Sequence, residues 1–472
     1  MDQILDPAIA GWLLAGFSIL WVLLGWRLGR NSNELDDYML AGRKVGLALG
    51  TATAMATWVT SNTTLVAPEM AYRLGVWGML GYSLGSVGLL LFAPMARRIR
   101  EVMPNGYTSG DFMRLRYGKT AWRVFLAVSL VYSFGWLVSL GSAGGVLIES
   151  LSGIDRTIGS TVILTICVLY TLLGGMRAVI GTDYVQTLVI ITGVVLVGVL
   201  TLTQVDLETV HTRIAETRPQ LLDVLMPAAV MFLFNNLLFG LGEIFHSNVW
   251  WSRAFAFGKG VGFKAYLLSG LLWIPIPIAA GFIALSAPAL GIGVPSSDYV
   301  GPMVAAEVLG AGGAIVLFVV VFSAIASSLD SLLAATSDLV VEDLYRRHLR
   351  PNAAKGELRR ASSFVILLLG VVTWLVVVLD LATLAQILNF TGALVASTIW
   401  PIAAGLYWRK TSAVGAALGM LLGSAGGLVA YFLIGFYTAA LVGAAISMVC
   451  VLVATQIAPD DFDWQDLQEE GA

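Results

Sequence analysis

The stretch from Phe322 to Tyr345, FSAIASSLDSLLAATSDLVVEDLY, carries the residue types best suited to hold a cation. The apolar run before it, AGGAIVLFVVVF, is typical of a helix inside a membrane. Hydroxyls and one carboxylate then recur at helical spacing, so that Ser323, Ser327, Asp330 and Ser331 share one face with the small residue Ala334. A carboxylate at bilayer depth costs about 2.5–3.5 kcal/mol on insertion scales, so it needs a partner, water or a cation.

Two interpretations of this face remain open. Hydroxyls, backbone carbonyls and a carboxylate are the oxygen ligands that hard cations prefer, which favours a cation site. Alternatively, the serines bond back to carbonyls of their own helix and allow neighbouring helices to pack closely.

The composition of the whole chain indicates where this helix lies. Of the 472 residues, 58% are hydrophobic and only 12% are charged, and the mean hydropathy is +0.84. These values exclude an ordinary soluble domain and predict an all-α polytopic membrane protein in contact with a lipid bilayer, with no nucleic-acid partner. Cys167 and Cys450 lie in apolar runs, so neither a disulfide framework nor a thiolate metal site is expected. The start, MDQILDPAIAGW, has no basic residue before its apolar run, unlike a cleavable signal peptide.

About thirteen apolar runs are long enough to span a bilayer. We expect an extra first helix at 9–28, followed by twelve helices at 45–72, 76–96, 121–152, 158–175, 177–203, 224–250, 264–290, 303–338, 360–380, 383–407, 412–436 and 438–457. Residues 1–472 then form a single transmembrane transporter domain, in which 45–410 is the core, 412–457 holds two C-terminal helices and 458–472 is an acidic cytoplasmic tail.

The basic residues predict an orientation across the cell (inner) membrane. With the N-terminus outside, 23 of the 27 Lys and Arg, Arg30 and Arg253 among them, fall in inner loops. The outer loops keep only Arg73, Arg156, Arg213 and Arg218. We therefore expect an outer N-terminus and a cytoplasmic C-terminus.

Two of the predicted spans carry signs of interruption. The helix at 45–72 has a polar run from Thr57 to Thr64, followed by Pro68, and the helix at 224–250 contains FGLGEIFHSN around Gly240, Gly242 and Glu243. Polar runs beside proline or glycine at membrane depth are typical of discontinuous helices that line a cavity. Paired breaks predict two inverted five-helix halves; the alternative is two glycine-kinked helices in an unrelated bundle.

Four stretches in order make the chain resemble the sodium:solute symporter family, which includes carriers of sugars, proline, pantothenate, sialic acid and urea. They are LAGR at Leu40–Arg43, YTLLGGMRAVIGTDYVQ at Tyr170–Gln186, SSLDSLL at Ser327–Leu333 with EDLY at Glu342–Tyr345, and GLYWRKTSAVGA at Gly405–Ala416. The resemblance implies a leucine-transporter-type fold with five-plus-five inverted repeats, and a transporter rather than an enzyme.

The resemblance also implies sodium sites. One Na⁺ would lie between the broken helix and the helix at 303–338, held by the backbone carbonyls of Ala56 and Val59 and by Ala324, Ser327 and Ser328. A second Na⁺, as in some members, would be held by Asp183, Ser327, Asp330 and Ser331. The alternative for Asp330 is a structural or gating acid bonded to a cytoplasmic arginine.

The solute is expected to bind beside the two helix breaks. The candidate contacts are Trp58, Thr60, Asn62, Thr63, Tyr82, Glu243, His246, Asn248 and Asn389, although packing and helix–helix hydrogen bonding could equally explain them. Proline carriers have an acidic residue where this chain has Trp58. The segments MPNGYTSGDFMRLRYG and VWWSRA resemble the urea-transporting branch most closely.

These features predict a sodium-coupled symporter that imports a small polar solute by alternating access. Proton coupling through Asp183, Asp330, Glu243 or a Glu243–His246 pair is one alternative, and a passive channel for a solute such as urea is another. A membrane-embedded enzyme fits least well, because no nucleophile–base pair or metal-ligand cluster is evident.

Overall fold

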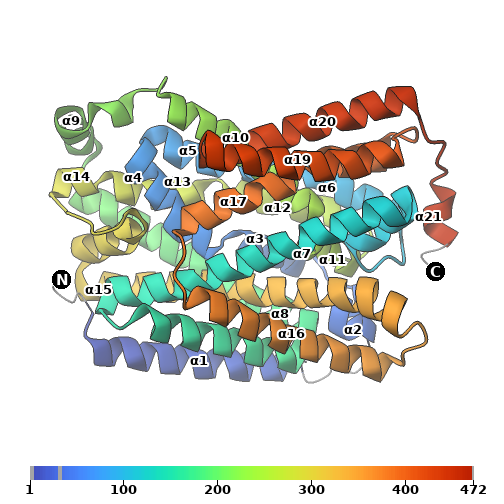
Figure 1. Cartoon of the computed structure of the whole chain (residues 1–472). Helices are drawn as coiled ribbons and strands as arrows, with labels where there is room; N and C mark the ends of the chain where they lie inside the picture. The colour runs from blue at the N-terminus through green and yellow to red at the C-terminus, as the bar shows by residue number, and fades with distance from the viewer. Residues whose placement is uncertain (1–4, 30–34, 470–472) are drawn as a thin grey trace.

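The computed structural model describes residues 5–29 and 35–469, apart from a few side chains that include Asn62. It is a bundle of long helices that run in broadly the same direction, with α1 (Pro7–Gly29) along one edge of the view and α19 (Ala413–Leu433) and α20 (Ala439–Ile457) along the opposite edge (Figure 1). Three points of the sequence predictions lie outside the described part: Arg30, the last three residues of the tail and the side chain of Asn62.

The remaining elements follow one another along the chain with short connections. They are α2 (Leu35–Leu40), η1 (Ala41–Arg43), α3 (Leu47–Trp58), η2 (Asn62–Val66), α4 (Ala67–Leu74), α5 (Val76–Ser83), α6 (Ser86–Val102), α7 (Ser109–Ser152), α8 (Arg156–Gln204), α9 (Leu207–Thr217), η3 (Pro219–Leu222), α10 (Pro227–His246), α11 (Asn248–Ala256), α12 (Val261–Trp273), α13 (Pro275–Leu285), α14 (Ala287–Leu290), η4 (Ser297–Tyr299), α15 (Val300–Leu339), η5 (Val340–Leu349), α16 (Lys355–Val377), α17 (Leu384–Ala396), α18 (Ile399–Tyr407), η6 (Phe436–Thr438) and α21 (Gln465–Glu469).

Among the described residues, eleven helical stretches are long and apolar enough to cross a membrane. The sequence predicted thirteen, and the difference has two causes. α8 is continuous except at Gly175 (φ 57°, ψ −155°), which lies where the predicted helices 158–175 and 177–203 meet. The predicted helix 45–72 is divided into α3, η2 and α4, and each of these pieces is too short to cross a membrane alone. The number thirteen and the inverted repeat therefore stay predictions.

The first predicted break is present. α3 ends at Trp58, and Val59 (φ −80°, ψ 81°) leaves the helical conformation. Thr60 and Thr63 then cap each other, because the backbone N–H of Thr60 donates to Thr63 Oγ1 (3.2 Å) and that of Thr63 donates to Thr60 Oγ1 (3.3 Å). The threonines of the polar run thus satisfy backbone groups that the broken helix leaves without partners.

The second break lies further along the chain than predicted. α10 continues through Gly240, Gly242 and Glu243 to His246, and the interruption falls at Ser247. The two glycines instead allow close packing. A Cβ on Gly240 would lie 2.6 Å from Gly85 Cα, and one on Gly242 would lie 2.4 Å from the carbonyl oxygen of Val395. The prediction of a break around Gly240–Glu243 was therefore wrong.

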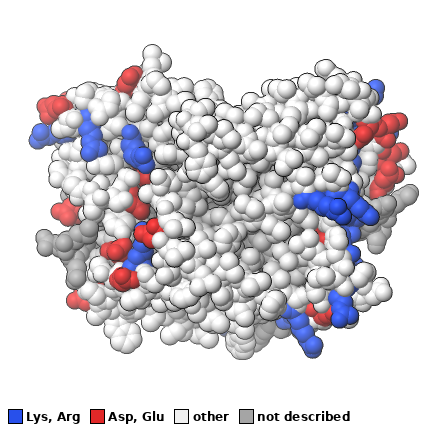
Figure 2. Space-filling view, viewed as in Figure 1, with Lys and Arg blue, Asp and Glu red and all other residues white. Residues whose placement is uncertain are grey.

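Charged side chains gather toward the two ends of the bundle, and an uncharged band lies between them (Figure 2). Such a band is expected of a surface that faces lipid. Arg253 departs from this pattern. Its side chain was expected in an inner loop, but it lies within α11 and is 0% exposed.

Candidate functional site

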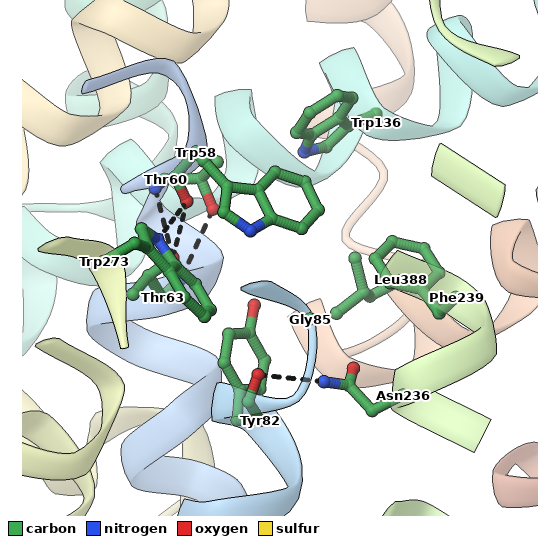
Figure 3. Close-up of a pocket in the computed structure, with 10 residues that line it drawn as sticks. All are labelled: Trp58, Thr60, Thr63, Tyr82, Gly85, Trp136, Asn236, Phe239, Trp273 and Leu388. Atoms are coloured by element: carbon green, nitrogen blue, oxygen red, sulfur yellow. Dashed lines mark hydrogen bonds between the residues drawn. The ribbon is translucent and has the colours of Figure 1, made fainter. Parts of the chain in front are cut away.

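A small cavity lies beside the break between α3 and η2 (Figure 3). Its volume is about 20 Å³, against the roughly 10–15 Å³ that one water molecule requires. Six parts of the chain contribute its lining, which consists of Trp58, Thr60, Thr63, Tyr82, Gly85, Trp136, Asn236, Phe239, Trp273 and Leu388. No charged side chain of the described residues is among them, so the cavity suits a small uncharged molecule.

Aromatic rings form most of the wall. The ring of Trp58 meets Trp136 edge-on, with centroids 6.4 Å apart, and lies 5.8 Å from the tilted ring of Trp273. Tyr82 stacks on Trp273 at 6.2 Å. Flat aromatic faces offer a large contact area with little conformational freedom, so they suit a planar solute.

Polar groups in the cavity are few and mostly already bonded. The carbonyl oxygen of Trp58 accepts hydrogen bonds from Trp273 Nε1 (2.8 Å) and Thr63 Oγ1 (3.0 Å). Asn236 Nδ2 donates to the carbonyl oxygens of Gly81 (3.0 Å) and Tyr82 (3.1 Å). The indole N–H groups of Trp58 and Trp136 are buried and have no hydrogen-bond partner among the described residues. Two donors are thus available for an acceptor on a bound molecule.

The structure brings four of the predicted solute contacts to the cavity: Trp58, Thr60, Thr63 and Tyr82. Four others lie elsewhere. Asn389 Oδ1 accepts from Asn235 Nδ2 (2.9 Å). Asn248 joins two helices, because its Oδ1 accepts from the backbone N–H of Ser109 (3.0 Å) and its Nδ2 donates to the Ala335 carbonyl (2.9 Å).

Glu243 and His246 are buried beneath the aromatic wall. Glu243 Oε2 accepts from Trp250 Nε1 (2.8 Å), and the ring of Trp250 packs edge-on against Trp58 at 5.5 Å. Glu243 Oε1 and both ring nitrogens of His246 have no hydrogen-bond partner among the described residues. The pair therefore lies behind the wall of the cavity rather than in it.

The sequence reasoning missed six lining residues: Gly85, Trp136, Asn236, Phe239, Trp273 and Leu388. A tryptophan in the middle of a predicted span was an available signal for Trp136 and Trp273, because tryptophan is otherwise enriched at membrane interfaces. Nothing local distinguished Phe239 or Leu388 from other apolar residues that face lipid or protein.

The groups predicted for the first cation lie where α3 meets α15. Ser328 Oγ lies 3.1 Å from the carbonyl oxygen of Thr57 and 3.0 Å from that of Ala324. α3 ends beside Ala56 and Val59. Within the described part of the chain, the carbonyl oxygens of these two residues accept no hydrogen bond. Oxygen atoms with free lone pairs next to a serine-bearing helix are compatible with a monovalent cation.

The groups predicted for the second cation surround an arginine. Asp183 Oδ2 accepts from Arg253 Nη2 (3.1 Å) and from Thr53 Oγ1 (2.5 Å), and its Oδ1 accepts from Ser327 Oγ (2.5 Å). Arg253 Nη2 also donates to Ser331 Oγ (2.7 Å). Asp330 Oδ1 accepts from Ser331 Oγ (3.2 Å), whereas Asp330 Oδ2 is buried without a partner among the described residues.

A helix that is broken beside a small uncharged cavity inside the bundle is typical of membrane carriers of small solutes. The sequence profile described as "Sodium:solute symporter family" matches residues 38–423. The chain therefore belongs to the sodium:solute symporter family.

The names of curated proteins similar to this chain refer to different solutes. The "Urea-proton symporter DUR3" of Oryza sativa subsp. japonica is 27% identical, over 97% of this chain and 71% of that protein. The "Urea active transporter" of Saccharomyces cerevisiae is 25% identical, over 88% of this chain and 61% of that protein. The "Osmoregulated proline transporter OpuE" of Bacillus subtilis is 28% identical, over 87% of this chain and 86% of that protein.

Two solved structures show the same fold. A Na⁺-coupled sialic acid symporter in a substrate-bound outward-open state superposes with a TM-score of 0.78 over 96% of this chain and 99% of the other, at 17% identity. The transporter Mhp1, with bromovinylhydantoin bound, superposes with a TM-score of 0.57 over 94% of this chain and 99% of the other, at 15% identity. The predicted leucine-transporter-type fold is thus confirmed.

Proposed function

We propose that the protein is a sodium-coupled symporter that carries a small, planar, uncharged solute by alternating access, and that this solute is urea. The uncharged, tryptophan-walled cavity beside the helix break carries the proposal. A zwitterion or a carboxylate in such a place would lack a charged partner, which is costly in a membrane interior. Urea has no net charge, a flat shape that fits aromatic faces, and a carbonyl oxygen for unpaired indole N–H groups.

The relatives support this choice of solute. Urea stands in the names of the rice and yeast relatives, although the proline transporter from Bacillus subtilis is equally similar. The cavity favours urea between these, because no acidic or basic side chain stands among its described lining residues to pair with the charges of proline.

Sodium would act as a bridge between α3 and α15. The carbonyls of Ala56 and Val59 and the hydroxyl groups of Ser327 and Ser328, with Ala324, would hold one Na⁺. By joining the two helices, the ion stabilises the state that accepts solute, and its differential affinity for that state couples the two movements. One charge that moves through 100 mV supplies about 2.3 kcal/mol, and a tenfold solute gradient costs about 1.4 kcal/mol.

The test is uptake of radiolabelled urea into proteoliposomes that contain the purified protein. We expect accumulation above the external concentration only when an inward sodium gradient is imposed. Proline, pantothenate and sialic acid serve as competing solutes, and empty liposomes correct for the passive permeation of urea. Equal flux with and without sodium, with no accumulation, would identify a passive channel and reject the proposal.

Proton coupling is a second candidate, and a specific observation favours it. Asp330 and Glu243 are fully buried carboxylic acids, and such groups are rare inside membranes unless they exchange protons or bind ions. The rice relative is also named a urea-proton symporter. Uptake that follows an imposed pH gradient in sodium-free buffer, and is lost in Glu243→Gln or Asp330→Asn, would select this candidate.

A further inference from the structure

Arg253 is a fully buried cation at the meeting point of four helices. It lies on α11, six residues after the break at Ser247, and both Arg253 and its ion-pair partner Asp183 are 0% exposed. A single guanidinium buried in a membrane protein is costly unless its charge and its N–H groups are matched. Its environment therefore reflects a specific arrangement.

The guanidinium is matched by groups from three other helices. Nε donates to Thr53 Oγ1 (3.0 Å) and Nη2 donates to Thr57 Oγ1 (2.6 Å), both on α3. On α8 and α15, Nη2 donates to Asp183 Oδ2 and Ser331 Oγ. Nη1 returns to the Val249 carbonyl of its own helix (3.1 Å). A guanidinium presents five N–H donors in a fixed fork, so one side chain can join all these groups at once.

The same groups were expected to hold a second sodium ion. Of the four predicted ligands, Asp183 and Ser331 accept directly from Arg253. Ser327 donates its proton to Asp183. Ser331 Oγ lies 2.6 Å from the Ser327 carbonyl, to which it can donate. A cation needs oxygen lone pairs that point inward, and here the lone pairs already point at a guanidinium. Asp183, Ser327 and Ser331 are therefore already engaged, and Asp330 alone keeps an oxygen without a partner among the described residues. The set does not hold a second Na⁺ while Arg253 is in place.

We propose that Arg253 is a built-in cation that takes the place of a second sodium ion, so that the transporter binds one sodium per cycle. The charge that a second ion would bring from solution is supplied by the chain itself. The first predicted site, at the end of α3, shares only Ser327 with this cluster and keeps Ser328 and its backbone carbonyls. The inference rests on the proposed sodium coupling for its stoichiometry, but not for the occupancy of the Asp183 cluster.

The first measurement is the charge moved per solute by the wild-type protein in proteoliposomes, obtained from the reversal potential with urea as the probe. We expect one positive charge for each urea, and a Hill coefficient for sodium near one. Two charges for each urea, or a Hill coefficient near two, would overturn the proposal.

The second measurement asks whether removal of the guanidinium opens the cluster. Arg253→Gln leaves Asp183 buried without its cation, and we expect sodium chloride, compared with choline chloride, to raise the thermal unfolding midpoint of this variant more than that of the wild type. Binding of ²²Na⁺ to the purified variant should rise from one ion to two. Arg253→Lys, which keeps the charge, is the matched control and should bind sodium as the wild type does.

A double variant separates the loss of the cation from a general folding defect. Arg253→Gln with Asp183→Asn removes both charges, so it should recover much of the stability that Arg253→Gln loses and should not gain a sodium ion. If Arg253→Gln folds and its sodium binding equals that of the wild type, the proposal is rejected. If Arg253→Gln does not fold, the charge per solute of the wild type decides.

Failure of the proposed function gives a different pattern. If the wild type binds no sodium at all, sodium coupling is wrong, yet a gain of one ion in Arg253→Gln would still uphold the built-in cation. If the wild type binds one ion and Arg253→Gln gains none, sodium coupling stands and the built-in cation is rejected.

Discussion

Trp58 serves the site with both its ring and its backbone. The ring forms one wall of the cavity, while the carbonyl oxygen accepts from Trp273 and Thr63 because α3 has ended and no helical N–H reaches it. Trp58, which the sequence analysis named both as a candidate solute contact and as a departure from proline carriers, thus connects the break to the wall. Its indole N–H and that of Trp136 remain the unpaired donors.

We predict that Trp136→Phe raises the urea concentration for half-maximal uptake by about two- to twelvefold, because one neutral hydrogen bond contributes about 0.5–1.5 kcal/mol. The initial rate of uptake over a range of urea concentrations measures this. Trp21→Phe is the matched control, since the Trp21 N–H is also buried without a partner among the described residues but lies on α1, away from the cavity. Equal effects of both variants would remove Trp136 from the site.

We predict that Ser328→Ala raises the sodium concentration for half-maximal uptake by about tenfold or more, because a lost ligand to a charged group costs about 1.5–3 kcal/mol. Sodium activation of uptake at fixed urea gives this value. Thr336→Ala, on the same helix and equally buried, removes a hydroxyl that has no partner among the described residues, and it should leave sodium activation unchanged. Unaltered activation in Ser328→Ala would place the ion elsewhere.

At the scale of elements, the two helix breaks differ in how well the sequence predicts them. The first is marked by a threonine-rich run, and those threonines cap the broken ends. The residues that stabilise this break are therefore the same residues that predict it from the sequence. The second was assigned to Gly240 and Gly242, whose missing side chains instead admit Gly85 and the Val395 carbonyl. A glycine that permits close packing and a glycine that permits a bend look the same in a sequence, because only the neighbour distinguishes them.

Gly240→Ala should therefore destabilise the fold by about 1–3 kcal/mol through overpacking between α10 and the segment before α6. The midpoint of thermal unfolding in detergent, followed by size-exclusion chromatography, reports this change. Gly11→Ala is the control, because a Cβ there meets nothing within 4 Å. If the two variants unfold at the same temperature, Gly240 has no packing role.

At the scale of the whole molecule, the sequence predicted the fold better than the site. Hydrophobic runs and four motifs were sufficient for an all-helical carrier fold, since each depends on local composition. The site depends on which distant residues meet. Trp136, Trp273 and Arg253 are far from the break in sequence, and Arg253 was assigned to a loop because a charge near a span end usually lies in one.

The basic residues of the loops still predict the orientation, and labelling tests it. Glu208→Cys on α9 should react in intact cells with a membrane-impermeant maleimide, whereas Lys355→Cys at the start of α16 should react only after the membrane is opened. Both positions are exposed, and Cys167 is buried while Cys450 is partly buried. The unsubstituted protein is the control, and the opposite labelling pattern would place the N-terminus inside.

Asn248 has a consequence for helix movement. Its amide fastens the first turn of α7 to α15, near the end of the bundle where α21 packs on α7. Any movement that separates α7 from α15 at this end must break at least one of these two hydrogen bonds, which together contribute about 1–3 kcal/mol.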